Sequence, residues 1–179
     1  MATTYVALLR GINVGKAKRV AMTDLRAVIE SLGYTDARTL LNSGNAVFAS
    51  KKPLPGKAAE ELRAALLKKT GVSSRFTLRS AAELNDVVQK NPLLKMATDH
   101  TRLFAAFVNE PEDLARVKPL AKQEWKPDVV AMGPGVVYIW CPNGLLESKA
   151  QVAVSKLLGD GVTVRNWATV LKLRAVIGD

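Results

Sequence analysis

The order of the predicted secondary structure repeats along the chain, and this repeat limits the possible folds more than any other feature of the sequence. Apolar periodicity predicts the order strand, helix, strand, strand, helix, strand and a short extra helix within residues 5–88. The same order returns between residues 102 and 176. This order is typical of the ferredoxin-like split βαβ unit, an antiparallel sheet with helices on one face. We therefore predict an α+β fold made by tandem duplication of two ferredoxin-like (βαββαβ) halves.

Turn and cap residues set the expected limits of these elements. In the first half we expect strands at residues 5–10, 38–41, 46–49 and 75–78, with helices between Met22 and Gly33 and between Ala58 and Gly71. Ser80 and Glu83 form a capping box for the extra helix. In the second half we expect strands at 103–108, 129–132, 136–140 and 162–164, and helices at 112–120, 145–158 and from Asn166 to Val176.

The boundary between the halves is expected in the polar segment from Asn91 to Thr101, where Asn91-Pro92 ends a helix. We predict a basic first half over residues 1–95 and a second half with the closing helix over residues 96–179. With 179 residues, 48% of them hydrophobic, the chain is long enough to bury a core in each half.

Cysteine and histidine content excludes several classes of site. The single cysteine, Cys141, cannot form an internal disulfide, and the single histidine, His100, lies among polar residues where a general base is not expected. No cluster of cysteine, histidine or carboxylate residues has metal-ligand spacing, so neither a metal nor a cofactor is expected. No signal peptide or apolar segment of transmembrane length is present in the sequence, which favours a cytoplasmic protein without a membrane partner.

The positive charge is concentrated in the first half. The net charge is +10, and residues 1–98 carry 16 Lys and Arg against 7 Asp and Glu, whereas residues 99–179 carry 10 against 9. A basic field of this kind attracts nucleic acid, nucleotides or anionic metabolites, although it also serves simple solubility.

The segment from Arg10 to Arg19 is the first candidate site, because it follows a predicted strand and precedes a predicted helix. Glycine frees the backbone to turn N–H groups toward an anion, and the cations add attraction. The candidate phosphate ligands here are Arg10, Gly11, Asn13, Gly15, Lys16 and Lys18. Alternatively, the glycines only permit a tight turn, Asn13 satisfies the backbone and Arg10 pairs with an acid. No Walker or dinucleotide glycine pattern is present.

Two further groups of polar residues are candidates to complete this site. Ser43 and Asn45 flank Gly44 in a hairpin that can approach the same end of the sheet, although such triplets are often only turns. In the second half the candidates are Ser148, Lys149, Arg165 and Asn166, as a second half-site facing the first loop across a cleft. The structural alternative makes Asn166 a helix cap and Arg165 an ion-pair partner.

Aromatic residues of the second half allow a different hypothesis. Tyr138 and Trp140 share one face of a predicted strand, and Phe104 and Phe107 lie on the preceding strand. Exposed aromatics on a sheet stack on the bases of single-stranded RNA, whereas buried ones form core. Burial of the sheets is the favoured interpretation here.

Motifs at both ends of the chain resemble the bacterial domain-of-unknown-function family 1697. The N-terminal motifs are Ala7-Leu8-Leu9-Arg10-Gly11-Ile12-Asn13-Val14-Gly15 and Ser43-Gly44-Asn45 followed by Val47-Phe48. The C-terminal motifs are Ser148-Lys149 and Thr163-Val164-Arg165-Asn166-Trp167-Ala168-Thr169-Val170-Leu171-Lys172-Leu173. The resemblance implies a fold of two ferredoxin-like halves and implies no activity.

Three functions remain open from the sequence. The first is binding of a phosphate-bearing ligand, a nucleotide or a nucleic acid, through the loop from Arg10 to Arg19. The second is a small hydrolase or transferase acting on a phosphorylated or acyl-phosphate substrate by positioning and electrostatics. The third is a protein–protein interaction module whose motifs are purely structural. The sequence does not decide whether the chain is catalytic, and it does not set an oligomeric state.

Overall fold

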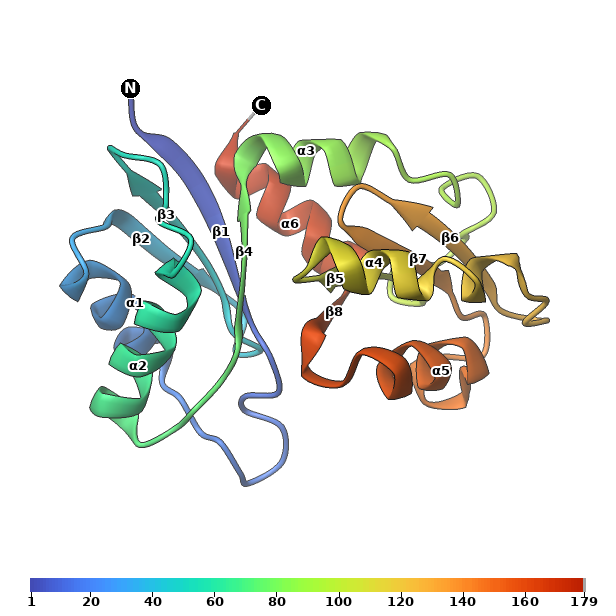
Figure 1. Ribbon diagram of the computed structural model, residues 1–179, viewed down its shortest axis with the longest axis horizontal. Helices are drawn as coiled ribbons and strands as arrows, with labels where there is room; N and C mark the ends of the chain where they lie inside the picture. The colour runs from blue at the N-terminus through green and yellow to red at the C-terminus, as the bar shows by residue number, and fades with distance from the viewer. Residues whose placement is uncertain (179) are drawn as a thin grey trace. The chain divides into compact units, whose positions relative to one another are not determined.

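Two four-stranded antiparallel sheets with helices make up the computed structural model, which describes residues 1–178 (Figure 1). The strands are β1 (Thr3–Leu9), β2 (Thr35–Leu40), β3 (Asn45–Ser50), β4 (Phe76–Ser80), β5 (Leu103–Val108), β6 (Val129–Gly133), β7 (Val136–Trp140) and β8 (Val162–Asn166). The first sheet has the order β2-β3-β1-β4 and the second β6-β7-β5-β8, so the second repeats the order of the first. The predicted α+β class and antiparallel sheets are therefore confirmed.

The helices and strands follow one another in the order that the periodicity predicted. They are α1 (Met22–Ser31), α2 (Ala58–Thr70), α3 (Ala81–Gln89), α4 (Pro111–Val117), α5 (Lys149–Leu158) and α6 (Trp167–Ile177). The contacts divide the chain into one unit of Met1–Leu84 with the segment from Leu173 onward, and a second unit of Asn85–Lys172. Helices α3 and α6 thus contribute residues to both units.

In the first unit, helices α1 and α2 cover one face of the sheet (Figure 1). Alternate residues of β1, Ala7 and Leu9, point to this face together with Phe48 of β3. They pack against buried side chains of the two helices, which are Leu25 and Ile29 of α1 and Leu62 and Leu66 of α2. Each of the large side chains contributes about 1.5–3 kcal/mol by leaving water. The ring of Phe48 also contacts the ring of Tyr34, with 4.8 Å between centroids.

The second unit has a core of the same design under α4 and α5. Val117 of α4 and Val154 and Leu158 of α5 pack on one face of the second sheet. The strand residues on this face are Phe104, Ala106 and Val108 of β5 and Val137 and Ile139 of β7. Helix α4 ends at Val117, two residues before Pro119, because proline has no N–H to continue the helical hydrogen bonds. The expected end near residue 120 was therefore about one turn too late.

Two predicted helix starts are confirmed by their hydrogen bonds. The Ser80 N–H donates to Glu83 Oε2 at 2.7 Å, and the Glu83 N–H donates to Ser80 Oγ at 3.2 Å, which is the capping box of α3. The Thr169 N–H donates to Asn166 Oδ1 at 2.9 Å at the start of α6.

Within residues 1–178, no helix has the length and apolar character needed to cross a membrane.

Candidate functional site

The segment from Arg10 to Arg19, the candidate anion loop, connects β1 to α1. Buried side chains near each end hold it in place. Ile12 and Val20 are buried, with 2% and 4% of their surface exposed, and both belong to the core of the first unit. Between them, Val14 to Arg19 are exposed. Burial of the two flanking side chains therefore holds an exposed segment of six residues at the end of the sheet.

Asn13 closes the base of this loop through three side-chain hydrogen bonds. Its Nδ2 donates to the Val20 carbonyl at 2.9 Å and to the Asn42 carbonyl at 2.7 Å, while its Oδ1 accepts from the Val20 N–H at 2.9 Å. The Asn13 N–H also donates to the Lys18 carbonyl at 3.0 Å. Asn13 has φ of 55°, a left-handed conformation that asparagine tolerates better than most residues. In this structure the amide therefore acts as a staple of the loop.

The turn between β2 and β3 packs directly against the loop, as its sequence position predicted. Gly44 has φ of 87°, and a methyl group there would lie 2.8 Å from both Leu9 Cβ and Ile12 Cδ1. The buried Asn45 amide donates to the Leu40 carbonyl and to Ser43 Oγ, each at 2.9 Å. The amide of Asn45 thus shapes the turn, and Ser43 is the exposed hydroxyl of the predicted pair.

Residues just before β4 complete this end of the sheet, and sequence reasoning missed them. The Arg10 N–H donates to the Arg75 carbonyl at 3.0 Å, and the Ser74 hydroxyl donates to the Arg10 carbonyl at 2.8 Å. Both arginines are half-buried. The available signal was the split βαβ order, which places the fourth strand beside the first and so brings Arg75 beside Arg10.

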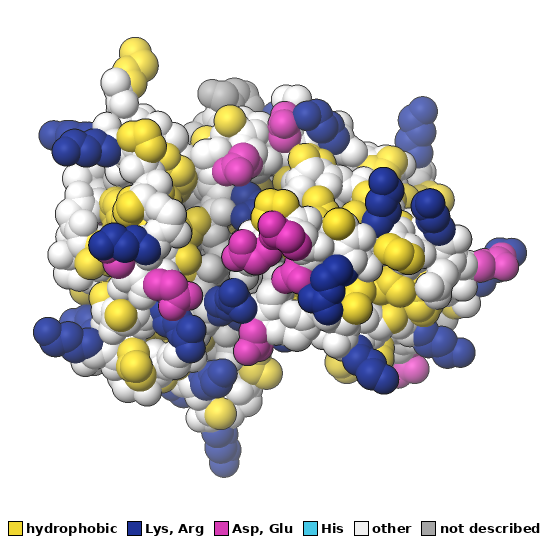
Figure 2. Space-filling model, viewed as in Figure 1, with side chains coloured by type: hydrophobic (Ala, Val, Ile, Leu, Met, Phe, Trp, Pro, Cys, Tyr) yellow, Lys and Arg dark blue, Asp and Glu magenta, His cyan; other side chains and the backbone are white. Residues whose placement is uncertain are grey.

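The exposed part of the loop carries three cations, Lys16, Lys18 and Arg19. None of the three forms an ion pair with another residue in the range 1–178. Figure 2 shows Lys and Arg side chains projecting at the edge of the first unit where Figure 1 places this loop. Gly11 and Gly15 both have left-handed backbone, with φ of 63° and 61°, as the turn required. The loop therefore presents unneutralised positive charge to solvent.

The candidates of the second unit have local roles that the structure defines. Ser148 is buried and caps α5, since its Oγ accepts from the Gln151 N–H at 3.0 Å and donates to Asp128 Oδ2 at 2.8 Å. Lys149 is exposed in the first turn of α5. Arg165 is buried on β8, and burial lowers the pKa of its guanidinium to about 10. Their predicted meeting with the first loop stays a prediction.

Cys141 lies in the same buried polar cluster as Ser148 and Asp128. The thiol is fully buried, and this burial, opposed by a hydrogen bond with Ser148 and assisted by the Asp128 charge, raises its pKa to about 11. A buried protonated thiol is a poor nucleophile. Cys141 therefore acts as a small buried side chain in the core of the second unit.

We predict that Cys141 reacts very slowly with a thiol reagent in the folded protein. At pH 8 a thiol with a pKa of about 11 has a thiolate fraction roughly two-hundredfold below that of an ordinary cysteine, and access is blocked as well. Absorbance during reaction with dithionitrobenzoate, in buffer and in denaturant, measures this. Equal rates under the two conditions would contradict the burial.

The aromatic side chains of the second sheet that were candidates for base stacking are buried or half-buried. Tyr138, Phe107 and Phe104 have 0%, 0% and 8% of their surface exposed, and Trp140 is half-buried. The Tyr138 hydroxyl donates to the Val87 carbonyl at 2.6 Å. These three rings cannot serve as an open platform for bases.

Among residues 1–178, no three carboxylate, histidine or cysteine residues gather as a metal site.

Comparison with known proteins supports the resemblance seen in the sequence motifs. A family model described as "Protein of unknown function (DUF1697)" matches residues 2–138. Among solved structures, the conserved bacterial protein SP0830 from Streptococcus pneumoniae is 24% identical, with a TM-score of 0.76 over 99% of this chain and 100% of that chain. At this identity the likeness supports the fold alone. No curated protein matches the chain.

Proposed function

The chain belongs to the family described as "Protein of unknown function (DUF1697)", so its function has to be inferred from its own residues. We propose that it binds the phosphate backbone of a nucleic acid through the loop from Arg10 to Arg19. The observation that supports this is the set of three exposed cations, Lys16, Lys18 and Arg19, that no described acid neutralises. Each such cation releases condensed counterions when it contacts a phosphate, which favours binding.

The geometry favours an extended polyanion over an enclosed small molecule. Small-ligand sites are concave and bury most of the ligand, whereas these cations stand on an exposed loop. The hydrogen bonds of Asn13 and the buried side chains of Ile12 and Val20 hold the loop in place, so little conformational entropy is lost on binding. Ser43 lies exposed on the adjoining turn, but its hydroxyl accepts from the Asn45 amide, so the three cations alone carry this proposal.

The proposal extends to the architecture and location of the protein. The strand orders β2-β3-β1-β4 and β6-β7-β5-β8, each with two crossing helices, support two ferredoxin-like units. The single buried cysteine supports a reducing, cytoplasmic location. Neither feature by itself indicates a ligand.

Neutralising the loop is expected to weaken binding of a short labelled single-stranded RNA by about 100-fold at low salt. The variant is Lys16→Gln, Lys18→Gln, Arg19→Gln, which keeps the side chains long and polar. Three lost phosphate contacts also reduce the slope of log K against log salt by about 2. Fluorescence anisotropy between about 50 and about 300 mM NaCl measures both quantities.

The matched control removes the same charge from the same unit. Lys51, Lys52 and Lys68 are exposed and lie outside the loop, so Lys51→Gln, Lys52→Gln, Lys68→Gln should reduce affinity much less than the loop variant. Equal losses in the two variants would mean that only the net charge matters. Absence of binding by the unmodified protein at low salt would refute the proposal outright.

A further inference from the structure

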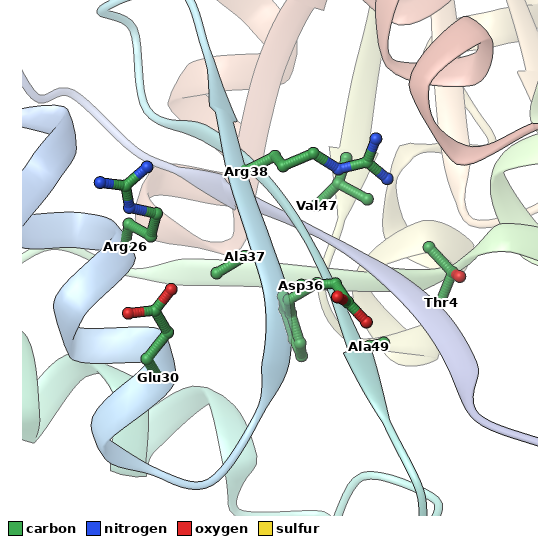
Figure 3. Close-up of a pocket in the computed structure, with 9 residues that line it drawn as sticks. Thr4, Arg26, Glu30, Asp36, Ala37, Arg38, Val47 and Ala49 are labelled. Carbon is green, nitrogen blue, oxygen red and sulfur yellow. The ribbon is translucent and has the colours of Figure 1, made fainter.

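A recess at the free edge of the first sheet is lined by charges of both signs. It has a volume of about 730 Å³ and wraps around β2, which is an edge strand of its sheet. Figure 3 shows Arg26 and Glu30 projecting from α1 on one side of β2, and Asp36 and Arg38 reaching over the other side. Thr4, Val47 and Ala49 form part of the floor. This is a balanced patch on a chain whose net charge is +10.

These four charged side chains have no ion-pair partner within residues 1–178. Asp36 only accepts a long hydrogen bond of 3.4 Å from its neighbour Thr35, and Arg38 donates to the Val176 carbonyl at 3.3 Å. All four are exposed. The charges of these two cations and two anions are therefore not neutralised by any described residue, and only Arg38 is engaged outside its own element, through its bond to the Val176 carbonyl.

The outer backbone edge of β2 is also available. β2 pairs only with β3 among the described strands, so its other edge presents unpaired N–H and C=O groups. Asp36, with φ of 54°, and Ala37 together stand opposite Phe48, which makes a β-bulge at the start of the strand. Ala37 is turned into the core, so no bulky side chain at this position blocks a neighbouring strand.

From this placement we infer that β2 is the contact surface for a second copy of this chain, which adds its own β2 in antiparallel orientation. A two-fold axis at Ala37 places Asp36 of each copy opposite Arg38 of the other. It also places Thr35 opposite Thr39, a favourable cross-strand pair. An isologous interface needs a surface complementary to itself, and the sequence Asp36-Ala37-Arg38 is self-complementary in charge.

The competing explanation is that the bulge and the charges only protect the edge. Natural edge strands use both devices to prevent pairing, and that explanation predicts a monomer at every concentration. A protective charge pattern of one sign would repel a second copy. The pattern here attracts one, and this is the feature on which the inference depends.

Sedimentation equilibrium of the full chain tests the inference, with a concentration-dependent dimer as the expected result. Arg38→Asp places two carboxylates opposite each other, and Asp36→Lys places two cations opposite each other, so each variant alone should be monomeric. Mixed in equal amounts, the two variants should form a heterodimer, and the double variant in one chain should again form a homodimer. Lys18 shows that lysine adopts left-handed backbone in this chain, which makes Asp36→Lys a tolerable substitution.

A control variant separates the edge from net charge. Lys95→Asp changes the net charge as Arg38→Asp does, at an exposed position in the second unit, and should leave the dimer unchanged. Circular dichroism confirms that each variant is folded. A wild-type monomer at the highest soluble concentration, a dimer unaffected by Arg38→Asp, or failure of the mixed variants to associate would each overturn the inference.

Discussion

Replacing Gly133 by alanine is expected to lower the free energy of unfolding by about 3 kcal/mol. A Cβ atom at this position of β6 would overlap Cε2 of the Tyr138 ring on β7 and lie 2.7 Å from its Cζ. The ring cannot move aside, because it is fully buried and its hydroxyl donates to the Val87 carbonyl at 2.6 Å. Its edge also contacts Trp167, with 6.1 Å between ring centroids. The substitution therefore forces a shift of backbone or of several core side chains.

Thermal unfolding by circular dichroism measures this effect, and roughly 6–12 °C of Tm should be lost. Gly56→Ala is the matched control, since a Cβ atom on Gly56 would meet no other atom within 4 Å and the backbone there has no left-handed φ. That control should change the Tm by less than about 2 °C. The double variant Gly133→Ala, Tyr138→Leu should be less destabilised than the sum of its single variants, because the smaller side chain relieves the contact. An additive double variant would contradict the packing argument.

Continuous apolar segments and capping residues made most of the fold predictable from sequence. The apolar segment Leu103–Val108 is short and lies between polar residues, which favours a buried strand, and Asn166 before an amphipathic segment marked the last helix. These signals are local, so they need no knowledge of tertiary contacts. They explain why the element order was correct in both halves of the chain.

The predicted first residues of two elements were wrong, because the polarity of the local sequence did not match its packing in the structure. The strand β2 begins at Thr35, three residues before the predicted start, because polar residues around the Asp36 bulge resemble a turn. The helix α5 begins at Lys149 after the Ser148 cap, although apolar residues from Leu145 suggested an earlier start. Leu146 is 95% exposed, so its apolar character did not report a buried helix face.

The composition of the candidate site was only partly visible in the sequence. The left-handed glycines and the approach of the Ser43 turn follow from local patterns, and the structure contains both. Ser74 and Arg75 lie more than sixty residues from Arg10 in the chain and reach it only through the register of β1 with β4. A sequence pattern does not specify that register, since pairing depends on which face each strand buries.

The second large effect is expected for Asn13→Ala, which should destabilise the first unit by about 2 kcal/mol. The variant removes the bonds to the Val20 carbonyl, the Val20 N–H and the Asn42 carbonyl. Alanine is also less tolerant of the left-handed backbone at this position. Asn13→Gly separates the two causes, because glycine adopts this conformation freely and loses only the hydrogen bonds.

Limited trypsin digestion reports the local consequence of Asn13→Ala. The exposed Lys16, Lys18 and Arg19 are trypsin sites, and a protease cuts a segment only when it can leave its folded conformation. Loss of the staple should increase the cleavage rate within the loop by roughly tenfold, with the rest of the digestion pattern retained. Mass spectrometry of the first fragments identifies the cut bonds. First cleavage at other sites in the variant would show that Asn13 does not control the opening of this loop.

The same variant connects loop order with the proposed binding of nucleic acid. Asn13→Ala removes no cation, so the slope of log K against log salt for single-stranded RNA should be unchanged while the affinity falls by about tenfold. The neutralised loop variant should instead reduce both the affinity and the slope. If Asn13→Ala binds RNA as tightly as the unmodified chain while trypsin cuts its loop faster, the cations act without a fixed geometry. Binding would then be a property of the charge of the loop and not of its structure.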